Sequence, residues 1–489
     1  MFSFANKIRL RFAPSPTGFL HIGSLRAALF TYLLAKSWGG KFILRIEDTD
    51  EKREVEGATD NLILVLKKIG LEFDEGPHSG GKYGPYTQTE RLDIYKRHSE
   101  ELLAAGKVYR CFCSEERLTE MRAAQEAAKQ PPRYDRLCRS LSLDEAAARA
   151  AGGESYVIRQ KMPLEGEVVV HDEIRGDIKF QAADLDDQVL IKSNGIPTYQ
   201  FASVVDDHLM EISHVTRAVE WLPSYPKNIL LYRDFGWTPP KFIHMPLILN
   251  KEGGGKLSKR RGDVFVEDYF AKGYLPEALI NFCVLLGWHP KSDQELWTLD
   301  ELKKDFTLEG LGASPAVFDT DKLDYFNAHY IRLKSVSELT RLTRPYLEEA
   351  GLLTDERQLE KFVALSQDRL KKLSDVVELT AFLFRLPEYS VDSLKWKKIS
   401  LEESLLCLGK IGSELSNVPA EKWDKAYLEK RLLEWIKEQG RPNGDYLWPL
   451  RYALTGQVYS PGPFEVADAL GREESLRRIS LATDKAQIV

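Results

Sequence analysis

The sequence predicts an α/β protein in which a doubly wound, Rossmann-type sheet is split by an α+β insertion and followed by an all-α C-terminal region. Three observations predict this fold class. Strand-like and helix-like segments alternate near the N-terminus, this pattern is interrupted from residue 109 to residue 196 and then returns, and beyond residue 307 the apolar residues have helical spacing. A chain of 489 residues is long enough for roughly two to four domains.

The N-terminal segment predicts the opening half of the sheet. Residues 7–13 alternate charged and apolar residues as a strand does, the run PSPTG breaks this strand, and a helix with apolar periodicity begins near Gly23. Residues 41–50 predict a second strand that ends in acids, among them Glu47, and residues 55–69 predict a second helix. We expect Glu47 at the ligand-binding edge of the sheet, although a solvated strand end is the alternative.

The next part of the chain predicts an insertion into this sheet. A Cys-rich hairpin begins near Tyr109, Ala-rich helices are expected at 116–129 and 143–151, and SYVIRQKM and GEVVVHDEI have strand-like composition. Residues 195–237 then return to the strand-then-helix pattern. Four polar residues of this stretch are expected on or beside apolar strands: Tyr199, Asp206, Asp207 and Arg217.

Beyond residue 307 the sequence predicts helices as far as its C-terminus. Segments such as QLEKFVALSQDRLKKL and AYLEKRLLEWIKEQG have apolar residues three and four positions apart, and no convincing period-two hairpin is found. We therefore expect an all-α end to the chain.

Composition restricts the class of protein. The hydrophobic content of 43% and the charged content of 29% are typical of globular proteins, and no apolar run approaches the roughly eighteen residues of a membrane helix. A net charge of −6 argues against indiscriminate coating of nucleic acid, but it allows local basic faces. We expect a cytoplasmic protein without a membrane partner, and nothing in the sequence requires more than a monomer.

The loop after the first strand predicts a nucleotide site. In an open α/β sheet this loop leads to the free N–H groups of a helix N-terminus, which attract anions. His21 can donate a hydrogen bond to a phosphate oxygen, and Gly23 has no Cβ to keep a purine from the backbone. A nucleoside triphosphate is the first candidate ligand, and an ordinary β-to-α turn with an incidental histidine is the alternative.

A second basic motif follows three glycines. The run KLSKRR contains Lys256, Lys259, Arg260 and Arg261. A cationic loop with glycine hinges suits the charge that builds up on transferring phosphates, whereas most such runs are solvated loops.

Both motifs resemble those of a known family. RFAPSPTGFLHIGS resembles the first signature of class I aminoacyl-tRNA synthetases, KLSKR resembles the second, and PSPTG and RAVEW are similar to the glutamyl branch. The two signatures are about 235 residues apart in the right order, which is far more specific than either alone. The resemblance covers essentially the whole chain.

The resemblance implies a bacterial-type or organellar glutamate–tRNA ligase. Such an enzyme activates L-glutamate with ATP to glutamyl-adenylate and transfers the glutamyl group to the 3′-terminal adenosine of tRNA(Glu), releasing AMP and diphosphate. Mg²⁺ is expected with the ATP. Whether tRNA(Gln) is a second partner is left open by the sequence.

The resemblance also assigns site residues. Catalysis falls to His21, Lys256, Lys259 and Arg260, ATP binding to His21, Gly23 and Lys259, and glutamate binding to Arg11, Ser15, Glu47, Tyr199 and Arg217. The planar fork of arginine can bind both oxygens of a carboxylate.

Two further sites are implied. Cys111, Cys113, Tyr134 and Cys138 resemble a structural Zn²⁺ site found in part of the family, with three reduced thiols without metal as the alternative. Arg369 occupies the position of an arginine that reads the third anticodon base, with a solvated helix arginine as the alternative.

The expected domain organisation follows the family. It comprises the first half of the catalytic nucleotide-binding domain at 1–90, an inserted acceptor-arm-binding domain at 91–197, the second catalytic half at 198–250, a stem-contact domain with the KLSKR loop at 251–334, and two helical anticodon-binding parts at 335–391 and 392–489.

Alternative functions are less consistent with the sequence. Glutaminyl enzymes of this branch end in β-barrels, and truncated enzymes that glutamylate a modified base lack anticodon domains. A small nucleotidyltransferase would leave the helical half without a use, and an inactive tRNA-binding paralogue would be expected to lose His21, Gly23 or Lys259.

Overall fold

The computed structural model describes residues 8–251, 255 and 265–485. The chain divides into two compact units, one made of Met1–Phe270 with Pro276–Thr320 and the other of Ala271–Leu275 with Asp321–Val489. No helix within the described ranges is both long and apolar enough to cross a membrane.

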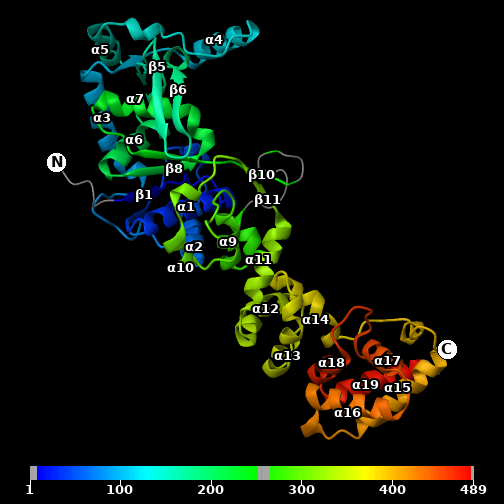
Figure 1. Cartoon of the computed structure of the whole chain (residues 1–489). Coiled ribbons are helices and arrows are strands. Elements are labelled where there is room, and N and C mark those ends of the chain that lie inside the picture. The colour runs from blue at the N-terminus through cyan, green and yellow to red at the C-terminus, as the bar shows by residue number, and fades with distance from the viewer. Residues whose placement is uncertain (1–7, 252–254, 256–264, 486–489) are drawn as a thin grey trace. The chain divides into compact units, whose positions relative to one another are not determined.

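The first unit is built on a six-stranded sheet (Figure 1). Across the sheet the strands lie in the order β2 (Lys41–Leu44), β1 (Arg9–Phe12), β8 (His214–Ala218), β9 (Lys241–Met245), β5 (Glu167–Asp172) and β6 (Gly176–Gln181). Neighbouring strands are parallel from β2 to β5, and β6 alone is antiparallel to its neighbour. The α/β, doubly wound fold class is confirmed.

Helices cover both faces of this sheet. The helix α1 (Ile22–Ser37) contacts β1, β2 and β8, and Thr31 of α1 is hydrogen-bonded to Thr216 of β8. Because side chains alternate along a strand, the next residue, Arg217, faces the opposite side, where α6 (Tyr199–Leu209) and α7 (Tyr225–Phe235) pack. Strand residues of this second face share one apolar core with α6 and α7.

The segment expected as the insertion contains two kinds of structure. A separate three-stranded antiparallel sheet consists of β3 (Val108–Cys111), β4 (Val157–Gln160) and β7 (Val189–Ile191). The β5–β6 hairpin instead continues the six-stranded sheet through the pairing of β5 with β9. The helices of this segment are α3 (Leu92–Ala104), α4 (Glu115–Ala127) and α5 (Leu143–Ala151).

The remaining elements of the first unit lie around α1 and beyond β9. They are α2 (Ala58–Ile69), β10 (Ile248–Asn250), α8 (Val266–Ala271), α9 (Pro276–Val284), α10 (Leu299–Asp305) and β11 (Ala316–Phe318). Both α9 and α10 pack on α1.

Two local expectations need correction. Tyr199, Asp206 and Asp207 lie in the helix α6 and not on a strand, because an apolar run this short has no period that separates helix from strand. Asp207 does lie beside a strand, since it accepts hydrogen bonds from Arg11 of β1. The chain is also not uniformly helical beyond residue 307, since β11 pairs in parallel with the distant β10.

The second unit is helical, as expected. It contains α11 (Thr320–Arg332), α12 (Val336–Glu349), α13 (Glu356–Ser366), α14 (Val376–Phe384), α15 (Leu401–Ser416), α16 (Lys425–Glu438), α17 (Asn443–Thr455), α18 (Pro463–Leu470) and α19 (Arg472–Lys485). One apolar cluster joins α13 and α14 to the helices from α15 to α19.

Candidate active site

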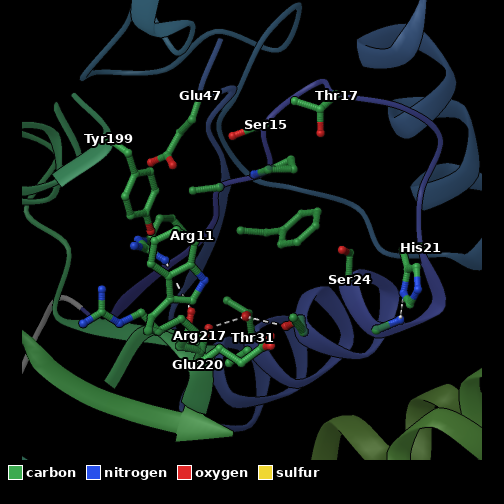
Figure 2. A pocket seen from close by; sticks show the side chains of 18 of the residues that line it. Arg11, Ser15, Thr17, His21, Ser24, Thr31, Glu47, Tyr199, Arg217 and Glu220 are labelled. Carbon is green, nitrogen blue, oxygen red and sulfur yellow. Dashed lines mark hydrogen bonds between the residues drawn. The ribbon is translucent and has the colours of Figure 1, made fainter. Parts of the chain in front are cut away.

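A pocket of about 860 Å³ opens at the carboxyl ends of β1 and β8, beside the N-termini of α1 and α6 (Figure 2). The structure brings together in its lining seven residues that the sequence singled out: Arg11, Ser15, His21, Gly23, Glu47, Tyr199 and Arg217. Figure 2 shows His21 at one end of the pocket and Glu47, Tyr199, Arg11 and Arg217 at the other.

His21 is the N-cap of α1. Its Nδ1 accepts a hydrogen bond from the backbone N–H of Gly23 at 2.9 Å, so Nδ1 carries a lone pair and the proton of a neutral ring lies on Nε2. The Nε2 atom is therefore a hydrogen-bond donor. A Cβ at Gly23 would lie 3.2 Å from His21 Nδ1, so the glycine leaves room for this cap.

The predicted basic loop cannot be placed in the same way. Lys256, Lys259 and Arg260 lie outside the described residues.

A buried network of charges holds the opposite end of the pocket. The Arg11 guanidinium donates to both carboxylate oxygens of Asp207, at 2.9 and 3.2 Å. Arg45 donates to Asp207 at 2.7 Å and to Glu47 Oε1 at 2.9 Å. Burial by itself would raise the pKa of Asp207, but the two arginines hold it below its usual value. This network fixes Arg11 and Glu47 from behind.

Two polar atoms of this end have no hydrogen-bond partner within the described part of the chain. They are Oε2 of Glu47 and Nη2 of Arg217, and both are buried. Burial raises the pKa of Glu47 to about 7, against the opposing effect of Arg45 and Arg11, and burial lowers the pKa of Arg217. A buried polar atom without a partner is costly, so an acceptor and a donor left unpaired in one pocket indicate a ligand with an ammonium and a carboxylate group.

Aromatic and hydroxyl groups complete this end. Tyr199 packs against Trp221 of the RAVEW segment with ring centroids 4.7 Å apart, and Ser15 lies in the loop after β1. Burial raises the pKa of Tyr199, which keeps its hydroxyl protonated and able to donate.

Sequence reasoning missed Arg45 and His244. Arg45 is fully buried and follows directly after β2, and His244 is a fully buried residue of β9 that accepts a hydrogen bond from Arg217 Nε at 3.0 Å. Each residue could have been found from a local signal, because the apolar runs KFILR and KFIHM each contain one of them as a charged or polar residue. Such residues are rarely buried without a partner, so their position predicts a buried polar contact.

The predicted zinc residues lie together in the first unit. The Sγ atoms of Cys111, Cys113 and Cys138 all lie within 4.8 Å of one another, and those of Cys113 and Cys138 are 3.6 Å apart. The Tyr134 hydroxyl is 3.2 Å from Cys111 Sγ and 3.5 Å from Cys113 Sγ. Two thiolates on one tetrahedral Zn²⁺, at about 2.3 Å each, lie about 3.8 Å apart, so the four donors fit this ion.

Arg369 lies in the second unit, at the end of the short 3-10 helix Gln367–Arg369 that follows α13. Its side chain is exposed. An exposed guanidinium is available to a partner, but the placement alone does not separate a base contact from a solvated arginine.

The two ends of the pocket have different chemistry. One end offers a helix N-terminus and an imidazole donor, which suit a phosphate. The other end offers arginines, a tyrosine hydroxyl and a glutamate, which suit an amino acid with an acidic side chain. A site of this kind can bring an amino-acid carboxylate to a nucleotide phosphate without an enzyme nucleophile.

Comparison with known proteins agrees with this geometry. Residues 7–325 match the family model of the class I tRNA synthetases (E and Q), catalytic domain, and residues 338–483 match an anticodon binding domain. The chain is 47% identical over 483 residues to a glutamate–tRNA ligase of Clostridium botulinum strain Hall, covering 98% of this chain and 99% of the relative. It is 44% identical to that of Clostridium tetani, covering 98% of each chain.

Solved structures give the same result. A crystal structure of a glutamate tRNA ligase from Elizabethkingia meningosepticum, in complex with its amino acid, superposes with a TM-score of 0.90 at 35% identity and covers 98% of this chain and 99% of that one. Glutamate-tRNA synthetase from Elizabethkingia anophelis gives a TM-score of 0.90 at 35% identity, covering 98% of this chain and 100% of that one. The chain therefore belongs to the glutamate–tRNA ligase family of class I tRNA synthetases.

Proposed function

We propose that this chain is a glutamate–tRNA ligase that activates L-glutamate with ATP and transfers it to the 3′-terminal adenosine of tRNA(Glu). The observation that carries the proposal is a pair of buried atoms at one end of the pocket, Oε2 of Glu47 and Nη2 of Arg217, which have no hydrogen-bond partner among the described residues. An amino acid supplies the cation and the anion that this pair lacks, and Arg11 at the same end suits a second carboxylate on its side chain.

Glutamate binds at the end of the pocket that holds these two residues. Glu47 receives the ammonium group, Arg217 and Arg11 receive the two carboxylates, and Tyr199 and Ser15 donate hydroxyl hydrogen bonds. Arg217 is the freer of the two arginines, because Asp207 already occupies two donors of Arg11. Glutamine would leave a guanidinium with a neutral amide in place of a carboxylate, and the site rejects it for that reason.

ATP binds at the end of the pocket that holds His21 and Gly23. The α-carboxylate of glutamate attacks the α-phosphorus, the bond to the β-phosphate bridging oxygen breaks, and diphosphate leaves. His21 donates from Nε2 to a phosphate oxygen, while Lys256, Lys259 and Arg260 supply positive charge as the diphosphate departs. Mg²⁺ accompanies the ATP and screens its phosphates.

The tRNA is bound by several parts of the chain. We assign the acceptor arm to the insertion at 91–197, the stem to 251–334 and the anticodon to the helices at 335–391 and 392–489. Arg369 reads an anticodon base through its exposed guanidinium. The enzyme acts as a monomer in the cytoplasm.

A structural Zn²⁺ completes the insertion. Cys111, Cys113, Cys138 and Tyr134 would hold it, and it would tie the end of β3 to the turn around Cys138. The ion takes no part in the chemistry of the pocket.

An acylation assay tests the proposal. The purified chain is incubated with labelled L-glutamate, ATP, Mg²⁺ and purified tRNA(Glu), and acid-precipitable label is measured, with tRNA(Gln) in parallel. Charging of tRNA(Glu) is expected, and label on tRNA(Gln) as well would extend the partners to that tRNA. Failure to charge tRNA(Glu) by protein that still binds it would point to the inactive tRNA-binding paralogue.

A further inference from the structure

Behind the pocket, three buried side chains from three strands form one hydrogen-bonded chain. Arg217 of β8 donates from Nε to His244 Nε2 on β9 at 3.0 Å, and His244 Nδ1 lies 2.7 Å from Asp172 Oδ2 at the end of β5. The side chains of His244 and Asp172 are 0% exposed.

The donor and the acceptor of each hydrogen bond in this series follow from the chemistry of its two end groups, the Arg217 guanidinium and the Asp172 carboxylate. A guanidinium can only donate hydrogen bonds and an ionised carboxylate can only accept them. His244 must therefore carry its proton on Nδ1 and present the lone pair of Nε2 to Arg217, which is the neutral imidazole. Burial lowers the pKa of His244, and although Asp172 opposes this effect, Arg217 lowers the pKa further.

This arrangement orients Arg217 without using its charge. Arg11 and Arg45 each form a salt bridge with a carboxylate, whereas no salt bridge to Arg217 is found in the described ranges. Its Nη2 atom is buried without a hydrogen-bond partner there. A neutral acceptor fixes the plane of the guanidinium, whereas a carboxylate in its place would compete with the carboxylate of a substrate.

We infer that His244, oriented by Asp172, is a positioning residue for the amino-acid substrate, because it holds Arg217 through Nε and leaves the arginine charge for a substrate carboxylate. This inference rests on the proposed function. His244 does not touch the substrate and acts through Arg217.

Asp172 links the pocket to the β5–β6 hairpin. Its Oδ1 accepts from the backbone N–H groups of Ile174 and Arg175 in the hairpin turn, at 3.1 and 3.0 Å, and its Oδ2 also accepts from the backbone N–H of His244 at 3.0 Å. Because Asp172 also supports the turn, His244 is the clearer position for a test.

The test compares steady-state charging of tRNA(Glu) by the wild-type chain and by His244→Phe, with His214→Phe as a matched control. His214 is another buried histidine of the same sheet, and its ring packs on Trp38 away from the residues that line the pocket. For His244→Phe we expect the KM for glutamate to rise about tenfold or more, because the variant loses a hydrogen bond to a charged group. The KM for ATP should be unchanged. His214→Phe should leave both values unchanged.

If the phenylalanine variant does not fold, two other substitutions of His244, to glutamine and to asparagine, still test the inference. The side-chain oxygen of glutamine can reach the place of Nε2, whereas that of asparagine reaches only the place of Nδ1. We expect His244→Gln to keep a KM for glutamate close to wild type and His244→Asn to raise it.

Three outcomes would overturn the inference. They are an unchanged KM for glutamate in His244→Phe, equal values in the Gln and Asn variants, and a parallel rise in the KM for ATP. In each of these cases the wild-type chain still charges tRNA(Glu) and the proposed function stands. If the wild-type chain does not charge tRNA(Glu), the proposed function and the inference both fail.

Discussion

Glu47 is a buried carboxyl group of the pocket. Arg45 holds one of its carboxylate oxygens, the other has no partner in the described part of the chain, and burial raises its pKa to about 7. Only the ionised carboxylate attracts an ammonium group strongly, so under the proposed function we expect binding of the amino acid to be coupled to this ionisation.

The first prediction is therefore a pH dependence. Since the pKa of Glu47 is raised, the carboxylate forms as the pH rises through about 7, and kcat/KM for glutamate should rise over the same range before it levels off. Glu47→Gln should lower kcat/KM by about tenfold or more at pH 8 and remove this rise. Charging rates at subsaturating glutamate between pH 6 and pH 8.5 test this, and a rise that persists in Glu47→Gln would assign it to another group.

At the residue scale, the sequence predicts the groups that line the pocket better than those behind them. Arg11, Tyr199 and Arg217 could be named because a resemblance carries their positions. Arg45 and His244 were missed, because a single polar residue in an apolar run names no role and their partners Asp207 and Asp172 are distant in sequence.

At the element scale, one arginine connects the helix α19 of the second unit to α14 and α17 through hydrogen bonds. Arg478 of α19 is 1% exposed, and its guanidinium donates to the carbonyls of Phe382, Leu383 and Leu454 at 2.7 to 3.0 Å. These carbonyls belong to the last turns of α14 and α17, where backbone acceptors have no partner within the helix.

The second prediction concerns this contact. Arg478→Met keeps an apolar stem but leaves the carbonyls unpaired, and it should lower the free energy of unfolding of the second unit by about 3 kcal/mol or more. The neighbouring Arg477→Met is the control, because that side chain is 55% exposed and forms an exposed ion pair with Glu474, so its loss should cost less than about 1 kcal/mol. Urea unfolding of the full chain measures both, and equal losses would contradict the account.

The third prediction concerns the thiol cluster. Protein purified without chelator should contain about one zinc per chain, and Cys138→Ser should bring the ratio close to zero because three donors hold the ion far less well than four. Cys407→Ala, which removes a buried cysteine of the second unit, should leave the ratio unchanged. Metal analysis of the three proteins decides, and a wild-type ratio near zero would favour three reduced thiols without metal.

Elements with a long, regular pattern could be predicted from the sequence, and elements defined by a distant partner could not. The helices α1 and α5 lie where the apolar and alanine-rich patterns place them. The three-residue strand β11 exists only because β10 lies beside it, and no local pattern reports that pairing. Residues 201–207 of α6 are all buried, so no alternation with polar positions marks this run as helix or strand, and the helix packs against α7.

At the scale of the whole molecule, the order of elements was enough to predict the fold class. A β-α-β-α opening, an interruption and a return require a split parallel sheet, because parallel strands need crossover connections. The participation of the β5–β6 hairpin in this sheet could not be foreseen, since it depends on the pairing of β5 with β9. That pairing brings Asp172 to His244 and so to the pocket.

The proposed function requires that the pocket select an amino acid with an acidic side chain through the charges of Arg217, Arg11 and Glu47. The most direct measurement is kcat/KM for charging tRNA(Glu) with labelled glutamate and, separately, with labelled glutamine. The account predicts a preference for glutamate of at least about a thousandfold, because glutamine leaves a buried guanidinium without its carboxylate. Charging with glutamine within about tenfold of glutamate would contradict it, since the arginines would then not be reading the side-chain charge.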